Sequence, residues 1–167
     1  DMNRFTIFAT LLALLLSLPL LAQDKPKPLP RDIPSLKELA EKGDAEAQFQ
    51  LAEKYYYGEG IEKDRAQSFK WASRSAAQNN PKAQYRLAWI YRQGREIAKD
   101  EDKAKALFKE SAGGLKKLAD QNDPQAQTFL GVLFSGGFGV EKDDKEAFKW
   151  VQKAAEQNHP HGQTNLG

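Results

Sequence analysis

Residues 126–159 read "AQTFLGVLFSGGFGVEKDDKEAFKWVQKAAEQNH", and most of this phrase occurs more than once in the chain. Its opening Ala-Gln pair returns at intervals of 36, 43 and 36 residues, as Ala47-Gln48, Ala83-Gln84, Ala126-Gln127 and the variant Gly162-Gln163. Within each of the first three copies a leucine, a small residue, an aromatic residue, a glycine and an aspartate follow at matching distances. A period of this length is typical of proteins built from stacked repeats.

Each copy is predicted to form a helix, a turn and a second helix. The apolar residues of the first half lie at helical spacing, so they fall on one side of a helix. A glycine then marks the turn, and an aspartate is placed to cap the second helix. The turn glycines are Gly58, Gly94 and Gly137, and the capping aspartates are Asp64, Asp100 and Asp143. Gln67 and Glu146 lie three residues after an aspartate, which predicts a reciprocal capping box in two copies.

The joins between copies also follow one pattern. Gly43, Asn79, Asn122 and Asn158 occupy one equivalent position. Glycine and asparagine tolerate the left-handed backbone that ends a helix. In the later copies a proline follows two residues on, where the first turn of a helix accepts it. One helix is therefore expected to end and the next to begin within about three residues.

The middle interval is longer by seven residues, close to two turns of helix. The additional residues lie near Gly113-Gly114, late in the second helix of the second copy. Two readings stay open. The insertion lengthens that helix without rotating its apolar face, or the glycine pair introduces a kink or bulge.

The N-terminal part differs in character from the repeats. Residues 1–22 combine Arg4 with an apolar run that ends at Ala22, which predicts a cleaved secretory signal peptide. The alternative is an uncleaved membrane anchor, for which this run is near the lower limit of length. Residues 23–34 hold four of the eight prolines and are predicted to form an extended linker. The repeat domain is expected over 35–167, with a cap helix at 35–43, in which Ser35 and Glu38 form a capping box, repeats at 44–79, 80–122 and 123–158, and a partial copy at 159–167. Either the natural protein continues past Gly167, or this last copy is a frayed cap.

Composition excludes several classes of function. The net charge is only +2, which argues against nucleic-acid binding and, once the signal is removed, against membrane binding. The chain has no cysteine, so disulfides, thiolate zinc sites and cysteine nucleophiles are excluded. We expect no cofactor and no metal.

The repeat unit AQ-x-x-L-[AG]-x-x-Y-x-x-G-x-G-[IV]-x-x-D resembles the Sel-1-like repeat over roughly residues 36–167. The second copy departs from it, with Glu96 and Leu107 in place of glycine and tryptophan. The resemblance implies an all-α fold, a right-handed α/α superhelical solenoid similar to tetratricopeptide arrays. It also implies an adaptor, exported in many bacterial members. Some relatives serve in envelope signalling or polysaccharide assembly, and some are immunity proteins against secreted toxins.

Three other features are interpreted as structural. Residues 136–140, "GGFGV", follow a helix, whereas a dinucleotide-binding loop follows a strand, so we predict a turn with positive φ. The two histidines of "HPH", His159 and His161, are too few for a metal site. The recurring aspartates lie one repeat apart and form no acid–base pair.

The candidate binding surface comes from the first helix of each copy. Some positions there point away from the predicted core and differ between copies, which indicates freedom from the scaffold. In solenoids such helices line the inner face, and exposed Tyr, Trp and Arg are enriched at binding hot spots. The predicted partner-binding residues are Phe49, Gln50, Glu53, Tyr56, Tyr85, Arg86, Trp89, Arg92, Phe129 and Val132; Tyr57, Gln93 and Thr128 share the face.

Two functional hypotheses follow. The first is a non-catalytic module, periplasmic or secreted, that binds a protein or peptide partner along its inner face, as an adaptor or as an immunity protein that neutralises a toxin. The second is a cell-wall or β-lactam hydrolase, an activity attributed to cysteine-rich relatives whose cysteines this chain lacks. No nucleophile–base arrangement is visible in the sequence, which favours the first hypothesis.

Overall fold

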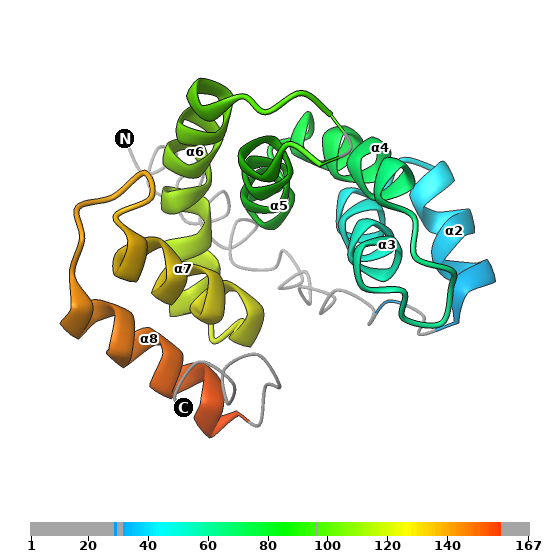
Figure 1. The fold of residues 1–167 in the computed structure, drawn as a ribbon. Helices are drawn as coiled ribbons and strands as arrows, with labels where there is room; N and C mark the ends of the chain where they lie inside the picture. The colour runs from blue at the N-terminus through cyan, green and yellow to red at the C-terminus, as the bar shows by residue number, and fades with distance from the viewer. Residues whose placement is uncertain (1–28, 30–31, 96, 158–167) are drawn as a thin grey trace, which may run out of the picture.

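The computed structural model describes residues 29, 32–95 and 97–157. These residues form seven helices and no strand: α2 (Ile33–Glu41), α3 (Ala45–Tyr57), α4 (Arg65–Ala76), α5 (Pro81–Gln93), α6 (Glu101–Asp120), α7 (Pro124–Gly136) and α8 (Asp144–Glu156). Each helix packs against the next, and α5 also contacts α7. The helices form an arc from α2 to α8, with α3, α5 and α7 along its inner side (Figure 1). The predicted all-helical solenoid is confirmed.

Some predictions concern residues outside this description. The following lie outside the described residues: the signal peptide over 1–22, linker residues 23–28 and 30–31, and the partial copy at 159–167 with both histidines. Among the helices that are described, none combines the length and the apolar character needed to cross a bilayer.

The helix ends follow the repeat pattern. Gly58, Gly94 and Gly137 adopt left-handed φ angles of 78°, 59° and 65° at the ends of the first helices. Asn79 and Asn122 do the same between copies, with φ angles of 62° and 66°. The carboxylates of Asp64, Asp100 and Asp143 accept backbone N–H groups at the starts of α4, α6 and α8. The predicted turns at these glycines and asparagines and the predicted caps at these aspartates are therefore confirmed, whereas Asn158 lies outside the described residues.

The predicted reciprocal capping boxes are wrong, because another acceptor occupies the backbone N–H. The N–H groups of Asp64, Asp100 and Asp143 donate to the carbonyls of Tyr55, Tyr91 and Phe134, each at 3.0 Å. The turn folds back, so the carbonyl near the end of the first helix reaches the cap. The carboxylate of Glu146 is used elsewhere and accepts from Trp150 Nε1 at 3.0 Å.

The cap helix α2 begins at Ile33, two residues earlier than predicted. Its N-cap is Asp32, whose carboxylate accepts the N–H of Ser35 at 2.9 Å, so Ser35 is not the cap. Pro34 lies in the first turn, where its missing N–H costs no hydrogen bond. The helix thus uses residues that proline content had assigned to the linker.

The seven-residue insertion lengthens α6, which runs without interruption for 20 residues. Gly114 is required by packing: a Cβ atom there would lie 2.7 Å from Cβ of Pro81, at the start of α5. Gly139 brings the loop after α7 against α6, since a Cβ on it would lie 2.4 Å from the backbone N of Lys109. Gly114 thus allows close contact between the two helices of the second repeat, and Gly139 allows close contact between the second and third repeats. The "GGFGV" segment is a helix-to-helix turn.

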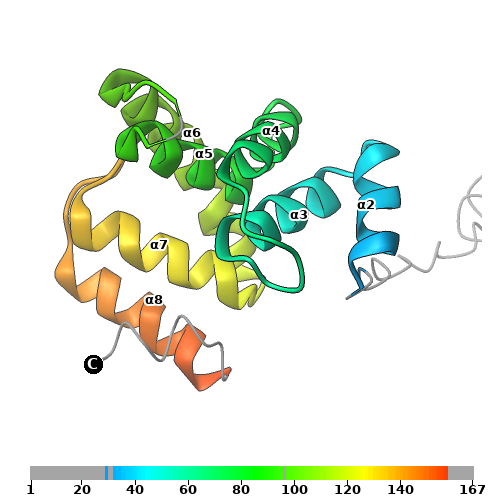
Figure 2. The ribbon, with the colours of Figure 1, turned by 45° about the vertical axis from the view of Figure 1, so that its right-hand side comes forward.

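The core lies between the first and second helices of the repeats. Leu51, Leu115, Leu130 and Trp150 are fully or almost fully buried. The small residue of each first helix admits the neighbouring helix: a Cβ on Gly131 of α7 would lie 2.5 Å from Cγ2 of Val151 on α8. Helices α7 and α8 accordingly lie side by side (Figure 2).

The repeated Ala-Gln pair has a structural role that the sequence did not reveal. The side-chain amides of Gln48 and Gln127 donate to the carbonyls of Ala40 and Ala119, at 2.9 and 3.1 Å. Each of these buried glutamines also accepts from a glutamine 30 residues later, Gln78 or Gln157, at 2.8 Å. The glutamine therefore joins the end of the preceding helix to the end of the following one.

Candidate partner-binding site

The ten predicted partner-binding residues fall into two groups. Phe49, Tyr85, Arg86 and Phe129 are buried, and none exposes more than 6% of its surface. The prediction that they lie on an open face is wrong. The other six are partly exposed on α3, α5 and α7: Gln50, Glu53, Tyr56, Trp89, Arg92 and Val132. Whether these six bind a partner stays a prediction.

The curvature of the arc explains the buried group. The rings of Tyr85 and Phe129 stack with centroids 4.1 Å apart, and Phe49 meets Phe129 edge-on at 6.4 Å. Phe49 and Phe129 belong to the first and third repeats, so the inner side is closed by side chains at this level. A helical wheel gives the direction of a side chain along one helix. It does not show how closely two other repeats approach.

Buried charges connect the helices beneath the inner face. Arg86 on α5 forms a bidentate ion pair with Glu53 on α3, in which Nη2 lies 2.8 Å from Oε2, and also donates to the hydroxyl of Tyr57 at 3.0 Å. Lys82 lies between the carboxylates of Glu46 at 2.6 Å and Asp123 at 3.2 Å. Burial lowers the pKa of Lys82, but these two carboxylates raise it by more, so the net pKa is above its usual value.

A hollow of about 170 Å³ opens on the inner face between α3, α5 and α7. Tyr57 on its rim is 41% exposed. Trp89 is held edge-on by Phe108 and Phe138, with ring centroids 5.5 and 5.4 Å away. The described residues that line the hollow are Tyr57, Tyr85, Arg86, Trp89, Gln93, Thr128, Phe129 and Val132. It therefore offers a fixed indole, a phenol and a valine to a partner.

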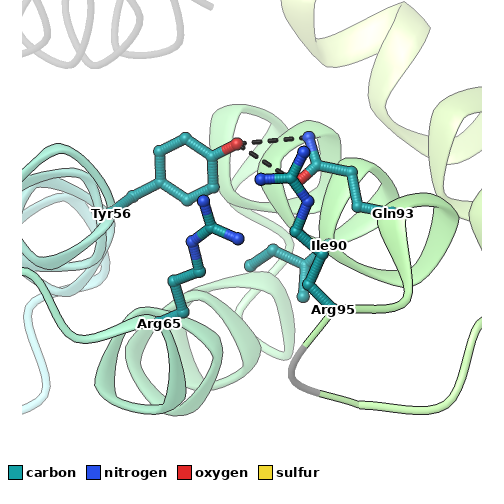
Figure 3. Close-up of a pocket in the computed structure, with 5 residues that line it drawn as sticks. All are labelled: Tyr56, Arg65, Ile90, Gln93 and Arg95. Carbon is teal, nitrogen blue, oxygen red and sulfur yellow. Dashed lines mark hydrogen bonds between the residues drawn. The ribbon is translucent and has the colours of Figure 1, made fainter.

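A second, smaller hollow adjoins the first where α3, α4 and α5 meet (Figure 3). Its described lining consists of Tyr56, Arg65, Ile90, Gln93 and Arg95. The hydroxyl of Tyr56 and the amide of Gln93 exchange hydrogen bonds at 3.3 and 3.2 Å. Arg65, Ile90 and Arg95 were not predicted from the sequence. Two of them come from a second helix and a turn, so a wheel of the first helices could not group them.

The three repeats match a known protein family. The Sel1 repeat family model matches residues 45–80, 81–113 and 124–159. The chain belongs to the Sel1 repeat family. Sel1 repeat proteins act as protein-interaction modules.

The chain is also similar to curated proteins from a bacterium and a plant. The chain is 33% identical over 127 residues to an uncharacterized protein of Neisseria meningitidis serogroup B, covering 76% of this chain and 24% of that protein. It is 31% identical over 118 residues to the ERAD-associated E3 ubiquitin-protein ligase component HRD3B of Arabidopsis thaliana, covering 70% of this chain and 17% of that protein. This Sel1 chain thus spans less than a quarter of the length of either relative.

Solved structures include a similar protein. The Sel1 repeat protein from Oxalobacter formigenes is 34% identical, with a TM-score of 0.46, and the match covers 82% of this chain and 98% of that one.

Within the described residues of the Sel1 chain, no group of three His, Asp or Glu side chains is placed to hold a metal ion.

Proposed function

We propose that this Sel1 chain is a non-catalytic interaction module that binds a protein or peptide at the inner-face hollow around Trp89. One observation carries the proposal. Tyr57, Trp89 and Val132, from three successive first helices, remain accessible around one hollow while the residues beneath them are buried. Rigid aromatic side chains beside a concave surface are the usual anchors of an interface.

The proposal also covers the compartment in which the protein acts and its role there. The composition of residues 1–22 favours export to the periplasm or secretion. In that setting an adaptor and an immunity protein that neutralises a toxin would use the same face. HRD3B is by its name a component of a ligase assembly, which is in keeping with a role in assembly rather than in catalysis.

Site-specific photo-crosslinking tests the face. A photoreactive phenylalanine analogue replaces Tyr57 in one variant and Phe148 in another. Phe148 is the matched control because it is 60% exposed but lies on α8, outside the hollow. We expect the variant at position 57 to form discrete crosslinked products with a protein or peptide partner. These products should disappear when Val132→Arg is added to the same variant, while the helical circular dichroism stays unchanged. Equal products from both positions would contradict the proposed face.

Catalysis is tested separately. Purified protein is incubated with a chromogenic β-lactam and with peptidoglycan. Turnover that a single polar substitution abolishes would contradict the non-catalytic proposal. We expect none above the rate with a heat-denatured sample.

A further inference from the structure

The lining of the hollow around Trp89 contains a charge that is already balanced. Among the described residues that line it, Arg86 is the only one charged at neutral pH. Two of its nitrogens contact the two carboxylate oxygens of Glu53, with Nη2 2.8 Å from Oε2. Both side chains are largely buried, with 6% of Arg86 and 13% of Glu53 exposed. The lining is therefore neutral, although a guanidinium forms part of it.

The ion pair determines how a charged ligand would fare in the hollow. Burial lowers the pKa of Arg86, but the carboxylate of Glu53 raises it by more, so the guanidinium stays charged. Its Nε and Nη2 are taken by Glu53 in a bidentate pair. An entering carboxylate would lose its water without gaining such a pair, and an ammonium group would meet a positive charge. The hollow thus disfavours ligands of either charge.

The amide and hydroxyl groups of the lining are also used within the chain. The amide of Gln93 exchanges hydrogen bonds with a tyrosine of α3 at 3.2 and 3.3 Å. The Oγ1 atom of Thr128 donates to the carbonyl of Pro124 at 3.0 Å. The surface that remains for a partner is mainly aromatic and aliphatic, with Trp89 and Val132 among its accessible members.

The size of the hollow matches one side chain. Its volume is about 170 Å³. A closed apolar cavity of about 150 Å³ takes up a benzene molecule. The stacked rings of Tyr85 and Phe129 form the buried part of the lining, with 5% and 6% of their surfaces exposed. One phenyl ring or one aliphatic side chain of similar size therefore fills the hollow.

We propose that the Glu53–Arg86 ion pair makes the hollow around Trp89 selective for one uncharged aromatic or aliphatic side chain of a peptide partner. This inference rests on the proposed function, because it requires the inner face to bind a peptide. It adds the chemistry of the side chain that enters. It also makes Glu53 a specificity-determining residue that acts through Arg86.

Amino-acid analogues test the selectivity directly. The probes are N-acetyl amides of Phe, Leu, Met, Glu and Lys, titrated into the full chain. NMR follows the indole N–H of Trp89, assigned with Trp89→Phe. The indoles of Trp71 and Trp150, which do not line the hollow, are internal controls. We expect the Phe, Leu and Met analogues to shift the Trp89 resonance and to bind at least about tenfold tighter than the Glu and Lys analogues.

Glu53→Gln tests the ion pair. The substitution keeps the shape of the side chain, and the guanidinium of Arg86 loses its counter-ion. We expect the Glu analogue to bind at least about tenfold tighter than it does to the native chain, and the Lys analogue to bind no tighter. Glu59→Gln is the matched control, because Glu59 pairs with Lys54 and does not line the hollow. Circular dichroism at the temperature of the titration shows that each variant is folded.

A second substitution tests the occupied space and leaves the ion pair intact. Val132→Phe narrows the hollow and should weaken binding of the Phe and Leu analogues by about tenfold. This variant and the native titrations decide the selectivity even where Glu53→Gln does not fold. Unchanged binding by Val132→Phe would show that the analogues bind elsewhere, and would overturn the inference.

The remaining outcomes separate the two proposals. Equal binding of the Glu and Phe analogues by the native chain would overturn the selectivity. A folded Glu53→Gln variant that discriminates as the native chain does would overturn the role of the ion pair. If no analogue shifts the Trp89 resonance, the inference is overturned as well, while crosslinking at position 57 still decides the proposed function.

Discussion

Three side chains at or beneath the inner face, Tyr57, Lys82 and Tyr85, have raised pKa values that make the stability of the fold depend on alkaline pH. Burial raises the pKa of Tyr85 well above its usual value of 10.0, and burial also raises the pKa of Tyr57. The pKa of Lys82 is raised above 10.5, because Glu46 and Asp123 outweigh the effect of its burial. All three groups hold their protons more tightly in the folded chain than in the unfolded one.

Because proton binding and folding are linked, these raised pKa values predict how the free energy of unfolding changes with pH. A group with a raised pKa in the folded state contributes its full stability below the unfolded pKa and loses it as the pH rises toward the folded pKa. The free energy of unfolding should therefore be steady near pH 9 and fall as the pH rises above about 10. Urea unfolding followed by circular dichroism between pH 8 and pH 12 measures it.

Tyr85→Phe provides the control for this pH dependence. It keeps the ring that stacks on Phe129 and removes the titrating hydroxyl. The fall in the free energy of unfolding above pH 10 should become shallower in this variant. An identical slope would mean that Tyr85 does not contribute to the alkaline loss.

Helix α6 shows how two adjacent residues of one element differ in their surroundings. Outside the local backbone of α6, no atom lies within 4 Å of the place where a Cβ on Gly113 would stand, whereas a Cβ on Gly114 would lie 2.7 and 2.9 Å from ring carbons of Pro81. Both residues lie inside the helix, where alanine is favoured over glycine by about 0.5–1 kcal/mol. Only packing distinguishes them.

We therefore expect opposite effects from one substitution. Gly113→Ala should stabilise the protein by about 0.5–1 kcal/mol, the difference in helix propensity. Gly114→Ala should destabilise it by about 1–3 kcal/mol, because the added methyl overpacks the contact between α6 and α5. Thermal and urea unfolding of the two variants compare them directly. Stabilisation by both would show that Pro81 moves aside without cost.

The same helix marks the limit of prediction from sequence. The positions of turns and caps were predictable because they depend on local residues such as Gly137 and Asp143. The two readings of the Gly113-Gly114 insertion were not separable, because the choice depends on Pro81 in another helix. The candidate site shows the same limit: Trp89 and Val132 were found on a helical wheel, but Arg65 and Arg95 become neighbours only after the repeats stack.

At the scale of the whole molecule, the curvature joins repeats that are not neighbours in the chain. In an ideal solenoid each repeat contacts only the adjacent ones, and stability is a sum of repeat and nearest-neighbour contributions. Here Phe49 of the first repeat meets Phe129 of the third. Lys82 of the second repeat binds Glu46 of the first and Asp123 of the third. The side chains on the inner side thus form one core that all three repeats contribute to, in addition to the interfaces between adjacent repeats.

A double-mutant cycle on Phe49→Leu and Phe129→Leu measures this sharing. A purely nearest-neighbour array predicts additive losses, whereas the edge-on ring contact predicts a coupling energy of about 0.5–1.5 kcal/mol. Leu36→Ala with Val151→Ala is the control pair, because α2 and α8 stand at opposite ends of the arc (Figure 1) and their losses should add within about 0.5 kcal/mol. Urea unfolding gives all the free energies. Additivity of the phenylalanine pair would mean that this contact does not couple the first and third repeats energetically.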